Sequence, residues 1–214
     1  MIIHWFGHAS LMIETQGKYI AIDPCIDPLI GIPMHNASIV LISRWHHEHI
    51  SLHTLGKIRG ENTMILGTKE SATEILGCAL LRPGEKIDIE GLTIMATPTK
   101  TISRRRLAAD KTDKVGFLIT SENKTIFYPG DTKFVEDFSH IKADVVLVPV
   151  GGMDTMNYKE AAELVQFLRP KIAIPIHWGR FAGTRDDAEM FKEIIEREKK
   201  TEVKILEENE RLEV

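Results

Sequence analysis

The chain has 214 residues, with 27 Lys and Arg against 31 Asp and Glu, which gives a formal net charge of −4. This length is enough for one large hydrophobic core, so we expect a single domain over residues 1–214. Neither sign of charge forms a long block, and no segment resembles a membrane span or a secretion signal, so we expect a cytoplasmic protein without nucleic-acid or membrane partners.

The first half of the chain is rich in predicted strands. Short apolar runs bounded by turn residues predict strands at residues 2–6, 11–15, 19–22, 37–42 and 64–67. Helical spacing of apolar residues predicts helices at residues 51–58 and 69–76. Three further strands are expected at residues 86–97, 115–120 and 124–128.

After residue 131 the pattern changes to alternating strands and helices. Strands are predicted at residues 144–150 and 172–176, and helices at 157–168 and 184–199. Asn157, followed three residues later by Glu160, is typical of a capped helix start. Two packed sheets with helices outside them satisfy this order of elements.

Side chains that can bind a metal follow three of the predicted strands: His46, Glu48, His49, Asp131 and His177. Functional groups in open α/β sheets gather at strand ends of this kind. Imidazole and carboxylate groups together suit Zn²⁺, Mn²⁺ or Fe²⁺. A single histidine after a strand is more often structural, so the combination carries the prediction of a metal site.

These motifs resemble those of metallo-β-lactamase-fold hydrolases, and the branch related to ascorbate-phosphate lactonases is the most similar. The resemblance rests on motifs that occur in the same order along nearly the whole chain: WFGHAS at 5–10, IDP at 22–24, RWHHEH at 44–49, YPGDT at 128–132 and PIHWG at 175–179. It implies a four-layer αββα sandwich. Because this fold carries several chemistries, it does not by itself fix the activity.

In that superfamily an HxHxDH loop, the aspartate of the GDT motif and later histidines hold two metals. The resemblance implies a second site at Glu48, His49, Asp131 and His177, with Glu48 in place of the family's aspartate. The first site keeps only His46 and a share of Asp131. The metal-binding motif is therefore degenerate, and we expect one divalent metal or none.

Positively charged residues stand where the first site has lost its ligands. Arg44 replaces the first histidine of the loop, and Lys100 or Thr101 stands at the place of a later one. A guanidinium about 4 Å from a divalent cation costs about 8 kcal/mol of repulsion at an effective dielectric of about 20. We expect Arg44 to point inward and pair with Asp131, although a side chain turned to solvent is the alternative.

Two groups outside the ligand set complete the expected site. His8 and Asp23 are interpreted as groups that orient ligands by hydrogen bonds. The run from Arg104 to Arg106 is either a solvated loop or a contact for an anionic substrate.

The leading hypothesis is a metal-dependent hydrolase that acts on an ester, lactone or phosphoester of a small anionic molecule. Asp131, Arg44 and Lys100 are its candidate catalytic residues, the last two as stabilisers of developing negative charge. The rival is an inactive descendant that binds an anion without metal. The sequence leaves the oligomeric state open, and a homo-oligomer is compatible with it.

Overall fold

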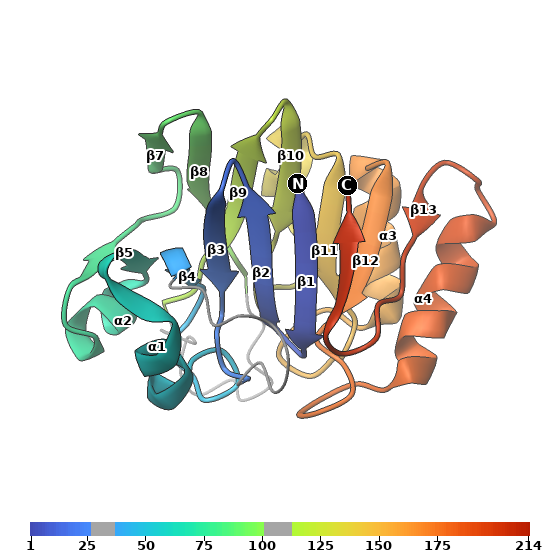
Figure 1. Cartoon of the computed structure of the whole chain (residues 1–214). Helices are drawn as coiled ribbons and strands as arrows, with labels where there is room; N and C mark the ends of the chain where they lie inside the picture. Colours follow the sequence, from blue (N-terminus) through green and yellow to red (C-terminus); the bar gives the residue numbers. More distant parts are fainter. Residues whose placement is uncertain (27–36, 101–112) are drawn as a thin grey trace.

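The structure, a computed structural model, describes residues 1–26, 37–100 and 113–214, and its strands form two seven-stranded sheets. The first sheet has the strand order β14 (Glu210–Glu213), β1 (Ile2–Gly7), β2 (Ser10–Thr15), β3 (Lys18–Ile22), β4 (Ala37–Ile42), β5 (Arg59–Gly67), β6 (Cys78–Leu80). The second has the order β13 (Glu202–Val203), β12 (Ile172–Ile176), β11 (Val145–Pro149), β10 (Lys124–Tyr128), β9 (Gly116–Ser121), β8 (Leu92–Thr97), β7 (Lys86–Ile89). Figure 1 shows strands β1 to β3 in front of strands of the second sheet.

Each sheet is antiparallel on one side and parallel on the other. In the first sheet β14, β1, β2 and β3 are antiparallel neighbours, whereas β3 to β6 are parallel. In the second sheet β7 to β10 are antiparallel and β10 to β13 are parallel. Parallel strands bring their carboxyl ends to one edge of a sheet, so the loops after β4, β10 and β12 are available to build a site there.

The main hydrophobic core lies between the two sheets. It joins Trp5 and Leu11 of the first sheet to Phe117 and Tyr128 of the second, all of them buried. Each such side chain contributes roughly 1.5–3 kcal/mol on burial. This shared core fixes the distance between the two sheet edges that carry the functional loops.

Helices cover the outer faces of the sheets. The second sheet carries α3 (Tyr158–Leu168) and α4 (Arg185–Glu196), and a 3-10 helix, η1 (Glu136–His140), lies between β10 and β11 in the chain. The first carries α1 (Leu52–Ile58) and α2 (Lys69–Glu74), and Leu55 and Ile58 of α1 pack with Val40 and Ile42 of β4. Figure 1 shows the two helix pairs at opposite ends of the molecule. The expected αββα sandwich is confirmed, and none of the helices in the described residues is long and apolar enough to span a membrane.

Most expected elements are present, with local corrections. Asn157 and Glu160 form the capping box expected at the start of α3. The single strand expected over residues 86–97 is wrong, because a turn at Glu90 and Gly91, both with positive φ, divides it into β7 and β8. The short strands β6, β13 and β14 were not expected, since they carry too few residues for a clear alternation.

Gly151, just after β11, packs against the backbone that carries His177. A Cβ atom there would lie 2.2 Å from the His177 carbonyl oxygen. We therefore predict that Gly151→Ala lowers the free energy of unfolding by at least about 1–3 kcal/mol, because backbone atoms must shift. Urea unfolding followed by circular dichroism measures this loss.

The exposed glycine of α1 supplies the control for this substitution. No atom lies within 4 Å of a Cβ built at Gly56. Gly56→Ala is expected to raise the free energy of unfolding by about 0.4–1 kcal/mol, as alanine does in a helix. Equal effects of the two substitutions would contradict the packing argument.

Candidate metal centre

Asp131 lies at the centre of the functional loops and receives three partners. Its Oδ2 atom lies 2.6 Å from Nη1 of Arg44 and 3.0 Å from Nε2 of His49. Its Oδ1 atom lies 3.2 Å from Nε2 of His177. All four side chains are buried or nearly so. The structure thus brings together Arg44, His49, Asp131 and His177, and it confirms that Arg44 points inward.

Local backbone contacts place Arg44 and Asp131 opposite each other. Arg44 is the second residue after β4, and the preceding carbonyl, of Ser43, accepts a hydrogen bond from Val115 N–H at 2.9 Å. Asp131 follows β10 through Pro129 and Gly130, whose φ of 67° favours glycine. The two sheets are therefore joined by a backbone hydrogen bond beside the ion pair.

Asp23 anchors His49 from the other side. Its Oδ2 accepts from Nδ1 of His49 at 2.8 Å, and Oδ1 accepts from the Ser43 N–H at 2.7 Å. The Tyr128 hydroxyl also donates to Asp23. Both ring nitrogens of His49 are therefore engaged by carboxylates, Asp23 and Asp131. This geometry fits the orienting role expected for Asp23.

The buried charges shift one another's pKa values. Burial lowers the pKa of His49, but the carboxylates of Asp131 and Asp23 outweigh it and raise the pKa to about 10. Burial raises the pKa of Asp131, but His49 and His177 outweigh it and hold the pKa well below its usual range. Burial, reinforced by Asp23, raises the pKa of Tyr128. An ionised Asp131 beside a protonated His49 is the state these charges favour in the absence of a metal.

The remaining predicted residues lie apart from Asp131. Oε2 of Glu48 lies 3.7 Å from Nδ1 of His46 and 3.9 Å from Nε2 of His8, while Oε1 lies 4.0 Å from Nε2 of His47. The backbone of Lys100 is tied to the loop after Asp131, with Lys100 N–H donating to the Thr132 hydroxyl, but its side chain is exposed. Thr101 and the run from Arg104 to Arg106 lie outside the described residues.

His8 lies inside the site, and the expectation that its ring orients ligands by hydrogen bonds is wrong, because neither ring nitrogen has a hydrogen-bond partner among the described residues. Its ring is fully buried, and its centroid lies 3.8 Å from that of His177. Burial, together with the nearby His177 and His49, lowers the pKa of His8 to about 2, so the ring is neutral. The WFGHAS motif was the available signal, because it places this histidine in the turn between two strands.

Three residues of the site have a left-handed backbone: His8 at φ 50°, Asp23 at φ 45° and His177 at φ 62°. Non-glycine residues in such conformations cost of the order of 1–3 kcal/mol each and persist where the surrounding structure imposes them. Their concentration here indicates that the fold gives up stability to place these side chains.

The donor set fits a divalent cation. Single ligand atoms of His49, Asp131 and His177 lie within 4.8 Å of one another, and so do those of His8, Glu48 and His177. Neighbouring ligands of tetrahedral zinc are roughly 3.3 Å apart. Oδ2 of Asp131 lies 3.0 Å from His49 and its Oδ1 lies 3.2 Å from His177, so each oxygen is at about this spacing from one histidine. Nδ1 of His177 has no hydrogen-bond partner in the described residues, and its Nε2 has only the ion-pair contact with Asp131. Imidazole nitrogen and carboxylate oxygen suit zinc, manganese and iron alike.

Comparison with known proteins identifies the family of this chain. The β-lactamase superfamily domain matches residues 2–177. The chain belongs to this superfamily. A UPF0173 metal-dependent hydrolase of Pyrobaculum neutrophilum is 30% identical over 224 residues, covering 96% of each chain. One from Methanopyrus kandleri is 30% identical over 216 residues, covering 92% of each chain.

Solved structures share the fold. Igni18, a metallo hydrolase from Ignicoccus hospitalis, has a TM-score of 0.82 and 24% identity, covering 99% of this chain and 97% of its own. An isothiocyanate hydrolase from Delia radicum gut bacteria has a TM-score of 0.81 and 17% identity, covering 100% of this chain and 99% of its own. The resemblance to metallo-β-lactamase-fold proteins is confirmed. The placement near ascorbate-phosphate lactonases stays a prediction.

Asp23 provides a test of the buried network. We predict that Asp23→Asn lowers the free energy of unfolding by about 3–5 kcal/mol, because an amide removes the countercharge of His49 and a hydrogen-bond acceptor. Urea unfolding at neutral pH measures the change. The exposed Asp154→Asn is the matched control and is expected to leave stability unchanged. If Asp23→Asn changed the free energy of unfolding as little as Asp154→Asn, the buried network would contribute little to stability.

Proposed function

We propose that residues 1–214 form one cytoplasmic domain that works as a metal-dependent hydrolase with a single divalent cation. The proposed substrate is a small anionic ester, lactone or phosphoester. The observation that carries this proposal is the Arg44–Asp131 ion pair, which lies beside imidazole groups able to bind a metal. The superfamily membership and the names of the UPF0173 metal-dependent hydrolases support it.

The positive charge of Arg44 limits the site to one cation. In the family's two-metal arrangement, the position of Arg44 would hold a ligand of the first metal. Its guanidinium instead lies 2.6 Å from Asp131, the residue that would bridge the two metals. A second cation there would be repelled at short range by the Arg44 guanidinium, which is always charged. His177 remains available as a ligand, because its Nδ1 has no hydrogen-bond partner among the described residues and its Nε2 lies 3.2 Å from Oδ1 of Asp131.

The cation, Arg44 and Lys100 would have different roles in hydrolysis. A divalent cation supplies Lewis acidity, which activates water and polarises the bond to be broken. Arg44 would bind the anionic group of the substrate and stabilise the negative charge that develops in the transition state. Its Nε atom is buried without a hydrogen-bond partner among the described residues, so it can donate to such a ligand. Lys100 would assist from the exposed loop beside Asp131.

A metal-free protein that binds an anion is the second candidate. The charge of Asp131 is already balanced by Arg44 and by the histidines that face it. A fold of this kind can therefore hold its site together without a cation. Elemental analysis after purification with added zinc, manganese or iron separates the two candidates, since the hydrolase binds one equivalent and the anion binder binds none.

Substrate charge tests the role of Arg44. We predict that Arg44→Met lowers kcat/KM at least about tenfold to a hundredfold more for anionic esters and lactones than for neutral analogues, because it removes the cation that meets the anion. The exposed Arg82→Met is the matched control. Activity that survives a chelator, or equal losses on charged and neutral substrates, would contradict the proposal.

A restoring double variant tests why only one cation binds. We predict that Arg44→His combined with Lys100→His raises the metal content from one equivalent to two, because both lost ligands return and the repulsion disappears. Thr101→His replaces Lys100→His in a parallel variant, because either position is aligned with the lost ligand. Elemental analysis measures the content, with Arg82→His and Lys86→His as the control pair. An unchanged content would mean that Arg44 does not exclude the second metal.

A further inference from the structure

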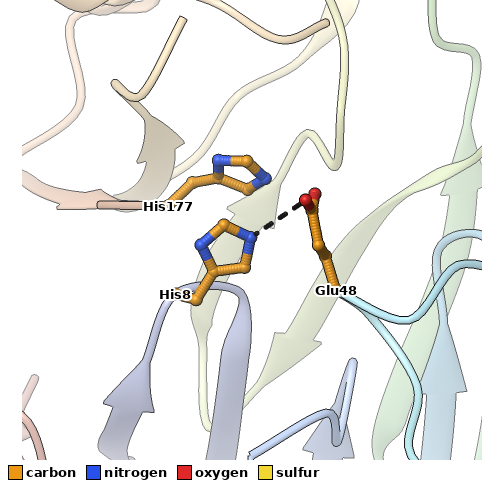
Figure 2. A group of neighbouring side chains, drawn as sticks. All are labelled: His8, Glu48 and His177. Atoms are coloured by element: carbon orange, nitrogen blue, oxygen red, sulfur yellow. Dashed lines mark ion pairs between the residues drawn. The ribbon is translucent and has the colours of Figure 1, made fainter. Parts of the chain in front are cut away.

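His8, Glu48 and His177 form a second group of ligands in the same cleft. They come from the turn between β1 and β2, the loop after β4 and the loop after β12. Nε2 of His8 lies 3.9 Å from Oε2 of Glu48, and one ligand atom of each residue lies within 4.8 Å of the others. Figure 2 shows both imidazole rings turning a nitrogen toward the Glu48 carboxylate.

Unused hydrogen-bonding capacity points to a missing ligand in this group. Both ring nitrogens of His8 and Nδ1 of His177 are buried without a hydrogen-bond partner in the described part of the chain, and Nε2 of His177 makes only an ion-pair contact, 3.2 Å from Oδ1 of Asp131. Leaving a buried polar group unsatisfied costs about 1–3 kcal/mol. Among the described residues, the ion-pair partners of Glu48 are histidines only: His8, His46 and His47. A cation would satisfy imidazole nitrogens and carboxylate together.

The backbone holds His8 beside His177. The carbonyl oxygen of His8 accepts hydrogen bonds from the His177 N–H at 2.9 Å and from the Trp5 indole N–H at 3.0 Å. The rings of Trp5 and Trp178 pack with centroids 4.8 Å apart behind this contact. The two histidines are therefore positioned by the fold before any ligand binds, which is a property of metal sites.

The group around Asp131 is less open to a cation. Both nitrogens of His49 face carboxylates, and Asp131 Oδ2 is engaged by Arg44 and His49. A cation there would have to displace these hydrogen bonds and approach the guanidinium. The carboxylate of Glu48 has no Lys or Arg partner among the described residues. A cation that binds on the side of Glu48 therefore displaces no ion pair between an arginine and a carboxylate.

We propose that the single divalent cation binds to His8, Glu48 and His177 rather than to His49, Asp131 and His177. This inference rests on the proposed function, because it specifies where the cation of that function binds. His177 belongs to both groups of ligands, so only one of the two groups binds a cation at a time. Two imidazoles, one carboxylate and an open fourth position are the ligand set of a catalytic zinc. The 3.9 Å between His8 and Glu48 closes by roughly half an ångström when the partly exposed Glu48 side chain turns.

Zinc affinity of single variants tests this assignment. We expect His8→Asn and Glu48→Gln each to weaken Zn²⁺ binding at least about tenfold in a chelator competition, because each removes a ligand. Asparagine is chosen because it tolerates the positive φ of His8. His49→Gln is expected to keep the zinc affinity within a few fold. The exposed His140→Asn is the control for loss of a histidine.

The absorption spectrum of bound Co²⁺ provides a second measure that does not depend on activity. We expect His8→Asn and Glu48→Gln to change this spectrum, and His49→Gln to preserve it. Where His8→Asn fails to fold by circular dichroism, Glu48→Gln carries the test, because its side chain is partly exposed.

The other outcomes are distinguishable. Loss of binding in His49→Gln with His8→Asn unchanged would overturn the inference and leave the proposed hydrolase in place. Loss of zinc binding in His46→Asn, with binding unchanged in His8→Asn, would assign the cation to His46, His47 and Glu48. That result would also overturn the inference. A parent protein that binds no zinc, manganese or iron would overturn both the inference and the proposed function.

Discussion

The buried ion pair between Arg44 and Asp131 is the interaction on which the geometry of the site depends. An unpaired carboxylate at this depth would cost several kcal/mol, and the guanidinium supplies a permanent countercharge. His49 and His177 complete the neutralisation. A guanidinium stays charged at neutral pH, so this countercharge does not depend on a bound cation.

The fold gives up backbone stability to build the rest of the site. His8, Asp23 and His177 each adopt a left-handed backbone conformation, and His8 and His177 also bury imidazole nitrogens without partners among the described residues. The large core between the sheets, with Trp5 packed on Trp178, offsets this cost. Unused polar groups held by a rigid core are a feature of functional sites, where local stability is exchanged for a ready binding geometry.

The sequence predicted the sandwich and the inward direction of Arg44, but it could not predict the grouping of the ligands. Arg44 is the second residue after a buried strand, so its direction is set by the strand. Glu48 lies in a turn closed by the hydrogen bond from His49 N–H to the His46 carbonyl, and this turn directs its carboxylate toward His8. The position of His8 follows from a backbone contact with His177, which is distant in sequence and leaves no local pattern.

Anomalous diffraction from crystals grown with excess zinc tests the central claim most directly, because it locates each metal relative to Arg44. The account predicts one zinc peak per chain beside His177, with Nη1 of Arg44 paired to Asp131 as in this structure. Two zinc peaks per chain bridged by Asp131, with Arg44 displaced from that carboxylate, would contradict it.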